Sequence, residues 1–307
     1  MSGKFIACPS CGRNRVTNLG EIPAFGYFAG RKLTEPLSGG SLFRCDSCWL
    51  YFRYPKLDNM KLDELYRQGS SDNWQHTISA RSDWVTALDW ISTLSVGRSV
   101  LDVGCFDGGF LSRLGSDYDL SGIEIHEGAA QAAEQKGIRI IAPSYRFLEE
   151  VDENFDIVTS FDVIEHVDDP LFFLKMISSI TRPGGAVIIS TGNTDAMSWR
   201  FMGSRYWYCT ISEHISFINP RWCDIAASNL GLRVERIEKF SHLAASTPMR
   251  IADLGKNMLY RVAPAVVAWL RTKGFGGIDV NIDPSLIYAP PNWMSATDHF
   301  MVLFRKE

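Results

Sequence analysis

The sequence predicts an α/β protein built on a Rossmann-like sheet, and three stretches of the chain carry this prediction. Residues 98–125 contain an apolar strand, a glycine-rich turn, the start of a helix and a second apolar strand. Residues 155–191 again read strand, helix, turn and strand. Alternating strands and helices are typical of a parallel sheet with helices on its faces. Two C-x-x-C pairs ahead of these stretches predict a small metal-binding ribbon.

The stretch 98–125 has the features of a nucleoside site. Its turn, 104–109, is rich in glycine, which lets the backbone approach a ligand at the start of the helix expected at 110–114. Glu124 lies near the end of the second strand, 22 positions after Asp102. A carboxylate at that place can accept both hydroxyls of a ribose. The geometry therefore suits a ligand that contains a nucleoside.

The charge of Asp102 indicates the other half of this ligand. The turn lacks the spacing of the dinucleotide fingerprint, and Asp102 would repel a pyrophosphate but could bind an ammonium group. A cationic amino acid joined to a nucleoside fits both features. The segment VLDVGCFDGGF resembles the first motif of the class I S-adenosylmethionine-dependent methyltransferases, with Phe106 in place of the usual middle glycine.

This resemblance extends through most of residues 98–240, where 155–191 matches the family's fourth strand, helix, proline–glycine turn and fifth strand. It implies a seven-stranded methyltransferase sheet and S-adenosyl-L-methionine as cofactor. One departure follows 138–141, where the family often has an acid for the adenine amino group and this chain has Pro143 and Ser144. A Rossmann-like sheet that has lost the cofactor is the alternative. The implied cofactor residues are Asp102, Gly104 and Gly108 for the amino acid end, Glu124 for the ribose, Phe106 and Ile125 for the apolar surroundings, and Asp162 at the ligand edge.

The composition is that of an ordinary globular protein, with 307 residues, 46% hydrophobic content and a net charge of −4. The longest apolar run, 262–270, is shorter than the roughly 20 residues that cross a bilayer, and it contains Pro264. No signal peptide precedes the first cysteine pair. Seven cysteines without an export signal favour thiols or a metal over disulfides. We therefore expect a cytoplasmic protein.

The two cysteine pairs predict a structural zinc site. Each pair places two thiolates on one turn, and two such turns complete the tetrahedral sulfur site that zinc prefers. A ribbon that has lost its metal and a thioredoxin-like redox role are the alternatives. Residues 1–56 carry eight Lys and Arg against three Asp and Glu, which suits an anionic substrate or partner, or a plain solvated surface. The predicted zinc ligands are Cys8, Cys11, Cys45 and Cys48.

These features divide the chain into five expected parts. They are a zinc ribbon at 1–56, a helical connector at 57–97, the methyltransferase core at 98–240, a cap insertion at 241–297 and the last core strand at 298–307. The connector includes a lid region around 69–76. The insertion is too long for a hairpin. Its stretch 251–273 has apolar residues at three- and four-residue steps and a break at Pro264, so we expect a helical cap over the active site. The same stretch is a candidate for peripheral membrane contact.

Two histidines are the catalytic candidates. His166 follows Glu165 at the carboxyl edge of the sheet, where the two could act as base or positioning groups, or bind a divalent metal together with Asp162. His214 lies in SEHISF, which resembles the EH-x-x-F element of a family subset in which the histidine faces the methyl group. A purely structural histidine is the alternative. Five aromatic residues between 199 and 208 either line a substrate pocket or pack their loop onto the core.

The reaction that these features predict is methyl transfer to an oxygen of a small molecule or a glycan. The acceptor class comes from a resemblance to ribbon-bearing methyltransferases of sugar and surface-polysaccharide pathways. An RNA base methyltransferase and a nonenzymatic zinc-ribbon adaptor are the alternatives. An acidic body without a long basic stripe argues against a nucleic acid partner.

Overall fold

The computed structural model describes residues 6–28, 31–56, 65, 81–241, 245–275 and 287–307, and the expected lid region, 69–76, lies outside them. Its centre is a seven-stranded sheet in the order β12-β13-β10-β9-β6-β7-β8. β13 is antiparallel to both of its neighbours, whereas β10, β9, β6, β7 and β8 run parallel. The predicted seven-stranded α/β sheet is confirmed. The strands are β6 (Ser99–Val103), β7 (Asp119–Ile123), β8 (Arg139–Ala142), β9 (Phe155–Phe161), β10 (Thr181–Gly192), β12 (Leu232–Phe240) and β13 (His299–Lys306).

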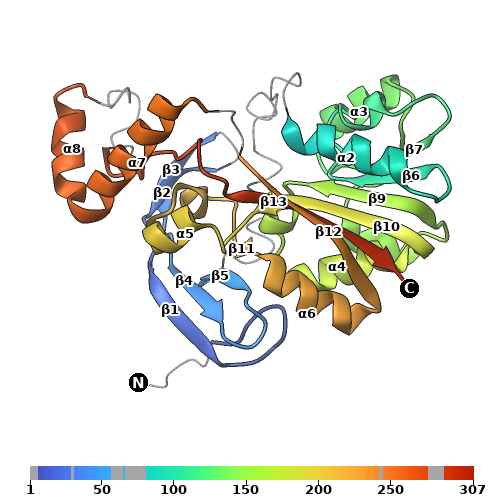
Figure 1. Ribbon diagram of the computed structural model, residues 1–307, viewed down its shortest axis with the longest axis horizontal. Helices are drawn as coiled ribbons and strands as arrows, with labels where there is room; N and C mark the ends of the chain where they lie inside the picture. Colours follow the sequence, from blue (N-terminus) through green and yellow to red (C-terminus); the bar gives the residue numbers. More distant parts are fainter. Residues whose placement is uncertain (1–5, 29–30, 57–64, 66–80, 242–244, 276–286) are drawn as a thin grey trace.

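Helices cover both faces of this sheet (Figure 1). α2 (Ser82–Thr93) and α3 (Glu127–Gln135) pack on one face, and α4 (Pro170–Ser179) and α6 (Pro220–Leu230) pack on the other. Every residue of β9 is buried as a result. Burial on both faces explains why the central strands read as nearly continuous apolar runs.

The starts of α4 and α6 follow from local sequence. The carboxylate of Asp169 accepts hydrogen bonds from the backbone N–H groups of Leu171 and Phe172, at 3.1 and 3.0 Å. Asn219 accepts one from the N–H of Trp222 at 3.0 Å. In both helices a proline follows the capping residue directly, where its missing N–H has no consequence.

The segment after the glycine-rich turn differs from the prediction. Instead of a helix at 110–114 the structure has a single 3-10 turn, η3 (Leu111–Arg113). Leu114 is already extended and Gly115 follows it, while β7 begins at Asp119, so the chain has no room for further helical turns. Four other short 3-10 elements are described: η4 (Tyr145–Glu150), η5 (Ile164–His166), η6 (Gly203–Arg205) and η7 (Trp207–Thr210).

The N-terminal ribbon is continuous with the core. Its strands β1 (Val16–Glu21), β4 (Ser41–Cys45) and β5 (Tyr51–Tyr54) form a sheet in the order β1-β4-β5-β11, and the last strand, β11 (Ser216–Phe217), comes from the methyltransferase core. β2 (Phe25–Phe28) and β3 (Arg31–Leu37) form a hairpin. Phe43, Leu50 and Phe52 of the ribbon share one hydrophobic cluster with Leu101 and Trp222. The ribbon and the core therefore bury their apolar side chains together.

The insertion before β13 contains two helices, α7 (Thr247–Val262) and α8 (Pro264–Thr272). The predicted break at Pro264 is confirmed, since the proline opens the second helix. Both helices lie at the end of the molecule that also holds α5 (Met197–Met202), and Arg261 Nε donates to the carbonyl of Phe201 at 3.1 Å (Figure 1). Among the helices described, none is long and apolar enough to cross a membrane.

Candidate active site

The glycine-rich turn is tightly packed where β6 ends. Gly104, Phe106 and Gly108 all have positive φ angles, of 81, 49 and 75°. A Cβ at Gly104 would lie 2.4 Å from Val163 Cγ2, and one at Gly108 would lie 2.1 Å from Ile138 Cδ1. Glycine is therefore required at both positions. Phe106 adopts the left-handed conformation that the family's usual glycine adopts without strain, so this departure keeps the shape of the turn.

Glu124 fastens the turn to the neighbouring strand. Its carboxylate accepts hydrogen bonds from the N–H of Phe106 at 2.9 Å and the N–H of His126 at 2.7 Å. Burial raises the pKa of Glu124, although both backbone donors favour its charged form. Ile125, next to it, is 48% exposed. Glu124, which is predicted to bind the ribose, and the exposed apolar side chain of Ile125 thus follow each other at the ligand edge of the sheet.

Asp102 lies inside the sheet, where it accepts a hydrogen bond from Thr159 Oγ1 at 2.7 Å. Burial raises its pKa to about 7. Asp162 follows β9 with a positive φ of 54° and receives a hydrogen bond from Arg81 Nη2 at 2.6 Å. Arg81 also contacts Asp83, and its charge favours the ionised form of Asp102. Sequence reasoning missed Arg81, whose one signal was its place directly before an amphipathic helix.

The raised pKa of Asp102 predicts a pH dependence of cofactor binding. At a pH below its pKa of about 7 this carboxyl becomes neutral and would lose its attraction for the ammonium group that the sequence predicts as its ligand. We expect the affinity for S-adenosylmethionine to weaken as the pH falls from about 7.5 to about 5.5, by up to roughly tenfold per unit. Isothermal titration at several pH values measures this. Asp102→Asn should bind weakly with a flat profile, and an equally steep profile in that variant would refute the assignment.

A second group of side chains gathers at the end of β9. The buried carboxylate of Glu165, in η5, accepts hydrogen bonds from Tyr208 Oη at 2.5 Å and Thr191 Oγ1 at 2.8 Å. The backbone carbonyl of Glu165 also accepts from the N–H of Ile215, which ties η5 to the segment that carries His214. Tertiary structure thereby joins positions about fifty residues apart into one site.

The rings of the two catalytic candidates are in edge-to-face contact. The rings of His166 and His214 have centroids 4.8 Å apart and are nearly perpendicular. His214 Nδ1 lies 3.1 Å from the carbonyl oxygen of Tyr208, which can only accept, so Nδ1 carries the proton and Nε2 keeps its lone pair. Burial, and then the neighbouring His166, lower the pKa of His214 well below its usual value. His214 is buried and neutral, whereas His166 is half-buried.

These histidines and Glu165 could also hold a cation. One ligand atom each of Glu165, His166 and His214 lies within 4.8 Å of the other two. The set expected from sequence was Asp162, Glu165 and His166. The structure differs because Asp162 is engaged by Arg81, while His214 joins the pair through the packing of its loop.

The aromatic segment is mostly core. Trp199, Tyr206 and Tyr208 are buried in a cluster with Phe217 and Leu42, so they pack the loop against the ribbon. Trp199 and Phe201 of the same segment also line a cavity. Next to them, between the ribbon and α5, lies a cavity of about 330 Å³ whose lining includes Arg44, Arg200 and Arg261. Neither the composition nor the motifs predicted this basic cavity.

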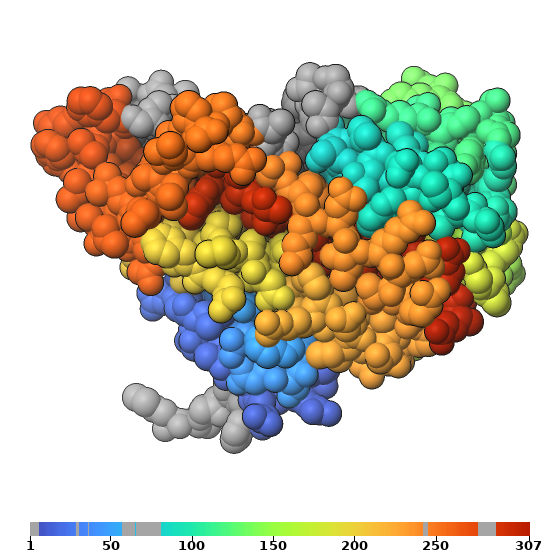
Figure 2. All heavy atoms as spheres, viewed as in Figure 1, coloured from blue at the N-terminus to red at the C-terminus, as the bar shows by residue number. Residues whose placement is uncertain are grey.

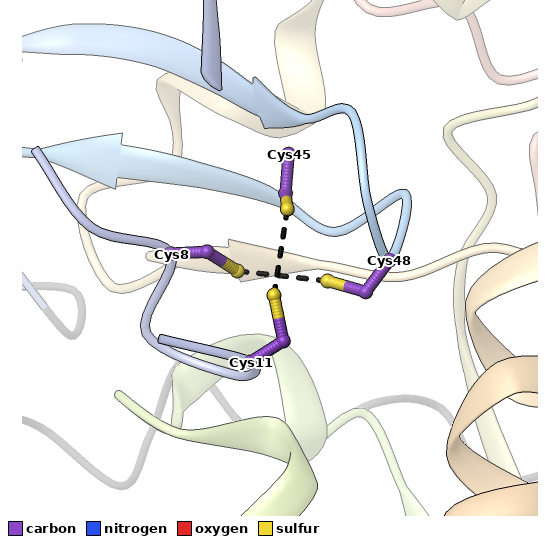
Figure 3. Close-up of side chains that lie close together, drawn as sticks. All are labelled: Cys8, Cys11, Cys45 and Cys48. Atoms are coloured by element: carbon purple, nitrogen blue, oxygen red, sulfur yellow. Dashed lines mark hydrogen bonds between the residues drawn. The ribbon is translucent and has the colours of Figure 1, made fainter. Parts of the chain in front are cut away.

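The four N-terminal cysteines converge as a metal site would require (Figure 3). The Sγ atoms of Cys8 and Cys48 are 3.5 Å apart, and those of Cys11 and Cys45 are 3.6 Å apart. Zinc–sulfur bonds of about 2.3 Å in a tetrahedron place the sulfur atoms about 3.8 Å apart. The arrangement therefore fits a zinc ion.

A seven-stranded sheet with an antiparallel β13, a glycine-rich turn after β6 and an acid after β7 defines a class I S-adenosylmethionine-dependent methyltransferase. Residues 75–237, more than half of the chain, match the methyltransferase domain family, and the chain belongs to that family. The predicted class of enzyme is confirmed.

Similar proteins include two curated relatives. The ubiquinone biosynthesis O-methyltransferase of Aeromonas salmonicida is 30% identical over 191 residues, which are 56% of this chain and 78% of the relative. The protein of the same name from Bordetella avium is 33% identical over 133 residues, and the match spans 39% of this chain and 55% of the relative. Among solved structures, a SAM-dependent methyltransferase from Archaeoglobus fulgidus aligns with a TM-score of 0.47 at 19% identity, over 81% of this chain and 100% of that one.

Proposed function

We propose that this methyltransferase transfers the methyl group of S-adenosylmethionine to an oxygen atom of a small-molecule acceptor. The observation that carries the proposal is the pair of adjacent imidazoles of His166 and His214, which lie beside the buried Glu165 at the ligand edge of the sheet. The names of the two relatives, both O-methyltransferases, support oxygen as the accepting atom. A hydroxyl must lose its proton on methylation, and a neutral imidazole can take it.

Each side chain has a definite part in this reaction. The acceptor oxygen attacks the sulfonium methyl group in line, the O–CH₃ bond forms as the S–CH₃ bond breaks, and S-adenosylhomocysteine leaves. Nε2 of His214 receives the hydroxyl proton. Tyr208 orients that imidazole through its carbonyl and holds Glu165 through its hydroxyl. The resulting imidazolium lies near the Glu165 carboxylate, which stabilises its charge.

For the cofactor, we assign the amino acid end to Asp102 and the turn from Gly104 to Gly108. The carboxylate of Glu124 would bind the ribose hydroxyls, and Phe106 and Ile125 would contact the base. Arg81, which already neutralises Asp162, supplies a cation for the cofactor carboxylate. These assignments follow from the positions of the residues around one sheet edge.

For the N-terminal site we propose one structural zinc ion bound by all four cysteines. The ribbon it holds contributes β5 to the pairing with β11 and so positions the segment that carries His214. The division into ribbon, connector, core, insertion and last strand remains our proposal for how the chain is organised.

Among the alternatives, the relatives reported above act by name in ubiquinone biosynthesis, so they give no support to a polysaccharide pathway. The acceptor screen described below therefore includes sugars, so that it can detect a glycan acceptor. The RNA alternative gains no specific observation from the structure. Membership of an enzyme family disfavours the nonenzymatic adaptor.

The test is an acceptor screen with methyl-labelled S-adenosylmethionine and the full-length protein. Separate reactions contain small phenols and catechols, hydroxylated sugars, or short RNA, and mass spectrometry locates the added methyl group. We expect label on a hydroxyl of a small molecule. We expect none with Asp102→Ala, which lacks the carboxylate that we propose binds the cofactor. Label confined to RNA bases, or to carbon or nitrogen, would overturn the proposal.

A further inference from the structure

Helix α7 turns its apolar face away from the protein. Ile251, Leu254, Met258 and Val262 follow each other at steps of three and four residues and therefore share one face. Their exposed fractions are 66, 45, 48 and 76%. A surface helix normally buries such a face, so this orientation requires another explanation.

The face of α7 that meets the protein is polar. Asp253, Asn257 and Tyr260 are buried there. The carboxylate of Asp253 accepts a hydrogen bond from the N–H of Ser295 at 3.0 Å, and Tyr260 Oη donates to the carbonyl of Tyr288 at 2.6 Å. Specific hydrogen bonds thus fix the helix with its polar face inward.

Helix α8 repeats this arrangement. Arg271 is buried and donates to the carbonyls of Ile287 and Ala289 at 2.8 and 2.6 Å. Val266 and Trp269 are instead 47 and 59% exposed. Two successive helices therefore present apolar side chains to the outside.

Six of the exposed apolar side chains on these two helices form what we call the insertion surface: Ile251, Leu254, Met258, Val262, Val266 and Trp269. The two helices that carry it occupy one end of the molecule (Figure 2). α5 lies next to it, because Arg261 donates a hydrogen bond to the backbone carbonyl of Phe201. Two apolar side chains of α5 are also exposed, Phe201 at 41% and Met197 at 86%. Exposed apolar areas of this kind mark interaction sites.

The exposed charges on helices α7 and α8 have one sign. Residues 247–273 hold five basic side chains and a single acid, Asp253, in a chain of net charge −4. Asp253 is buried and paired with Lys256. The exposed charges on these helices are therefore cationic. Arg250 and Arg261 flank the apolar face of α7, whereas Lys256 lies on the opposite side of the helix, beside Asp253.

We propose that the insertion surface docks this methyltransferase onto an anionic lipid bilayer as a peripheral contact. An apolar helix face flanked by arginines, with a tryptophan on the next helix, is the pattern of helices that lie in the membrane interface. A second copy of the chain fits less well, since it would oppose like charges. The surface lies outside residues 75–237, the segment that matches the family, so it is a property of this chain's own insertion. The inference does not depend on the proposed acceptor.

Vesicle flotation with the full-length protein tests the contact. We expect it to float with vesicles of phosphatidylglycerol and phosphatidylcholine, much less with phosphatidylcholine alone, and less at high salt. Val262→Asp combined with Trp269→Asp should weaken binding at least roughly tenfold, because two apolar side chains no longer leave water. Thermal unfolding should be unchanged, since both side chains are exposed.

The matched control is Val85→Asp, which places the same charge at a 59% exposed valine on α2, and it should bind vesicles like the native protein. Two results would overturn the proposal. One is a native protein that binds neither kind of vesicle. The other is light scattering that shows a dimer in the native protein and a monomer in the double variant, without vesicle binding, which would make the surface an interface between two copies.

Discussion

Replacement of Cys45 by serine is expected to destabilise the whole chain and not only the ribbon. Cys45 is fully buried in the cluster that also contains Leu101 and Trp222. Four thiolates around zinc contribute on the order of 10 kcal/mol to folding in isolated modules. That is comparable to the roughly 5–15 kcal/mol that stabilises a typical domain. Circular dichroism should show a single unfolding transition that moves to a much lower temperature, and chelation should have the same effect.

The physical reason lies in the contacts between ribbon and core. Arg53 Nη2 donates to the carbonyl of Cys209 at 2.7 Å, and Asn219 donates to the carbonyl of Trp49 at 3.0 Å. A ribbon that unfolds would leave these core groups without partners. Removal of the metal should therefore not unfold residues 1–56 alone and leave the core intact.

Two measurements accompany this prediction. Elemental analysis should find one equivalent of zinc in the native protein and in Cys223→Ala, a control that alters a buried cysteine outside the ribbon. A native protein free of metal, or a chelated protein whose core melts at the original temperature in a separate transition, would contradict it.

Replacement of His214 by alanine is expected to lower kcat by roughly 100-fold to 10,000-fold, the range lost with a general base. Cofactor affinity should stay nearly unchanged, because the glycine-rich turn and Glu124 lie on other elements. Initial rates and isothermal titration with S-adenosylmethionine measure the two effects separately. Tyr208→Phe, which loses the hydroxyl on Glu165 but keeps the carbonyl that orients His214, should lose much less activity.

His166 provides the comparison. It lies in η5, directly after the end of β9, so His166→Ala should act mainly on stability. We expect a lower thermal unfolding temperature and a smaller loss of kcat than in His214→Ala. The opposite outcome is informative. Near-normal turnover in His214→Ala, with an inactive but folded His166→Ala, would assign the proton transfer to Glu165 and His166 instead.

Much of the fold could be read from local signals. The start of β12 is one example, because its β-forming residues follow directly on a glycine that ends α6. The proline at position 264 separates α7 from α8 wherever the two helices pack. The helix predicted at 110–114 failed because so short a segment before β7 can close only one turn.

The site could be predicted only in part. Gly104 and Gly108 were recognisable because their spacing fixes the turn, and the four cysteines because two C-x-x-C turns suffice for one ion. Arg81 carried no such signal. Its role depends on Asp162, which is 81 residues away in the sequence and which the fold brings within 2.6 Å of it.

By itself, then, the sequence determined the strand and helix order, the glycine-rich turn and the two C-x-x-C turns, since each depends on residues that are close along the chain. Tertiary structure alone decided that His166 meets His214, that Asp162 pairs with Arg81 and that ribbon and core share one cluster. It also decided that α7 buries Asp253 and Asn257 and exposes Ile251 and Val262. A helical period defines two faces, but which of them is buried depends on hydrogen-bonding partners such as Ser295 and Tyr288, which only the folded chain supplies.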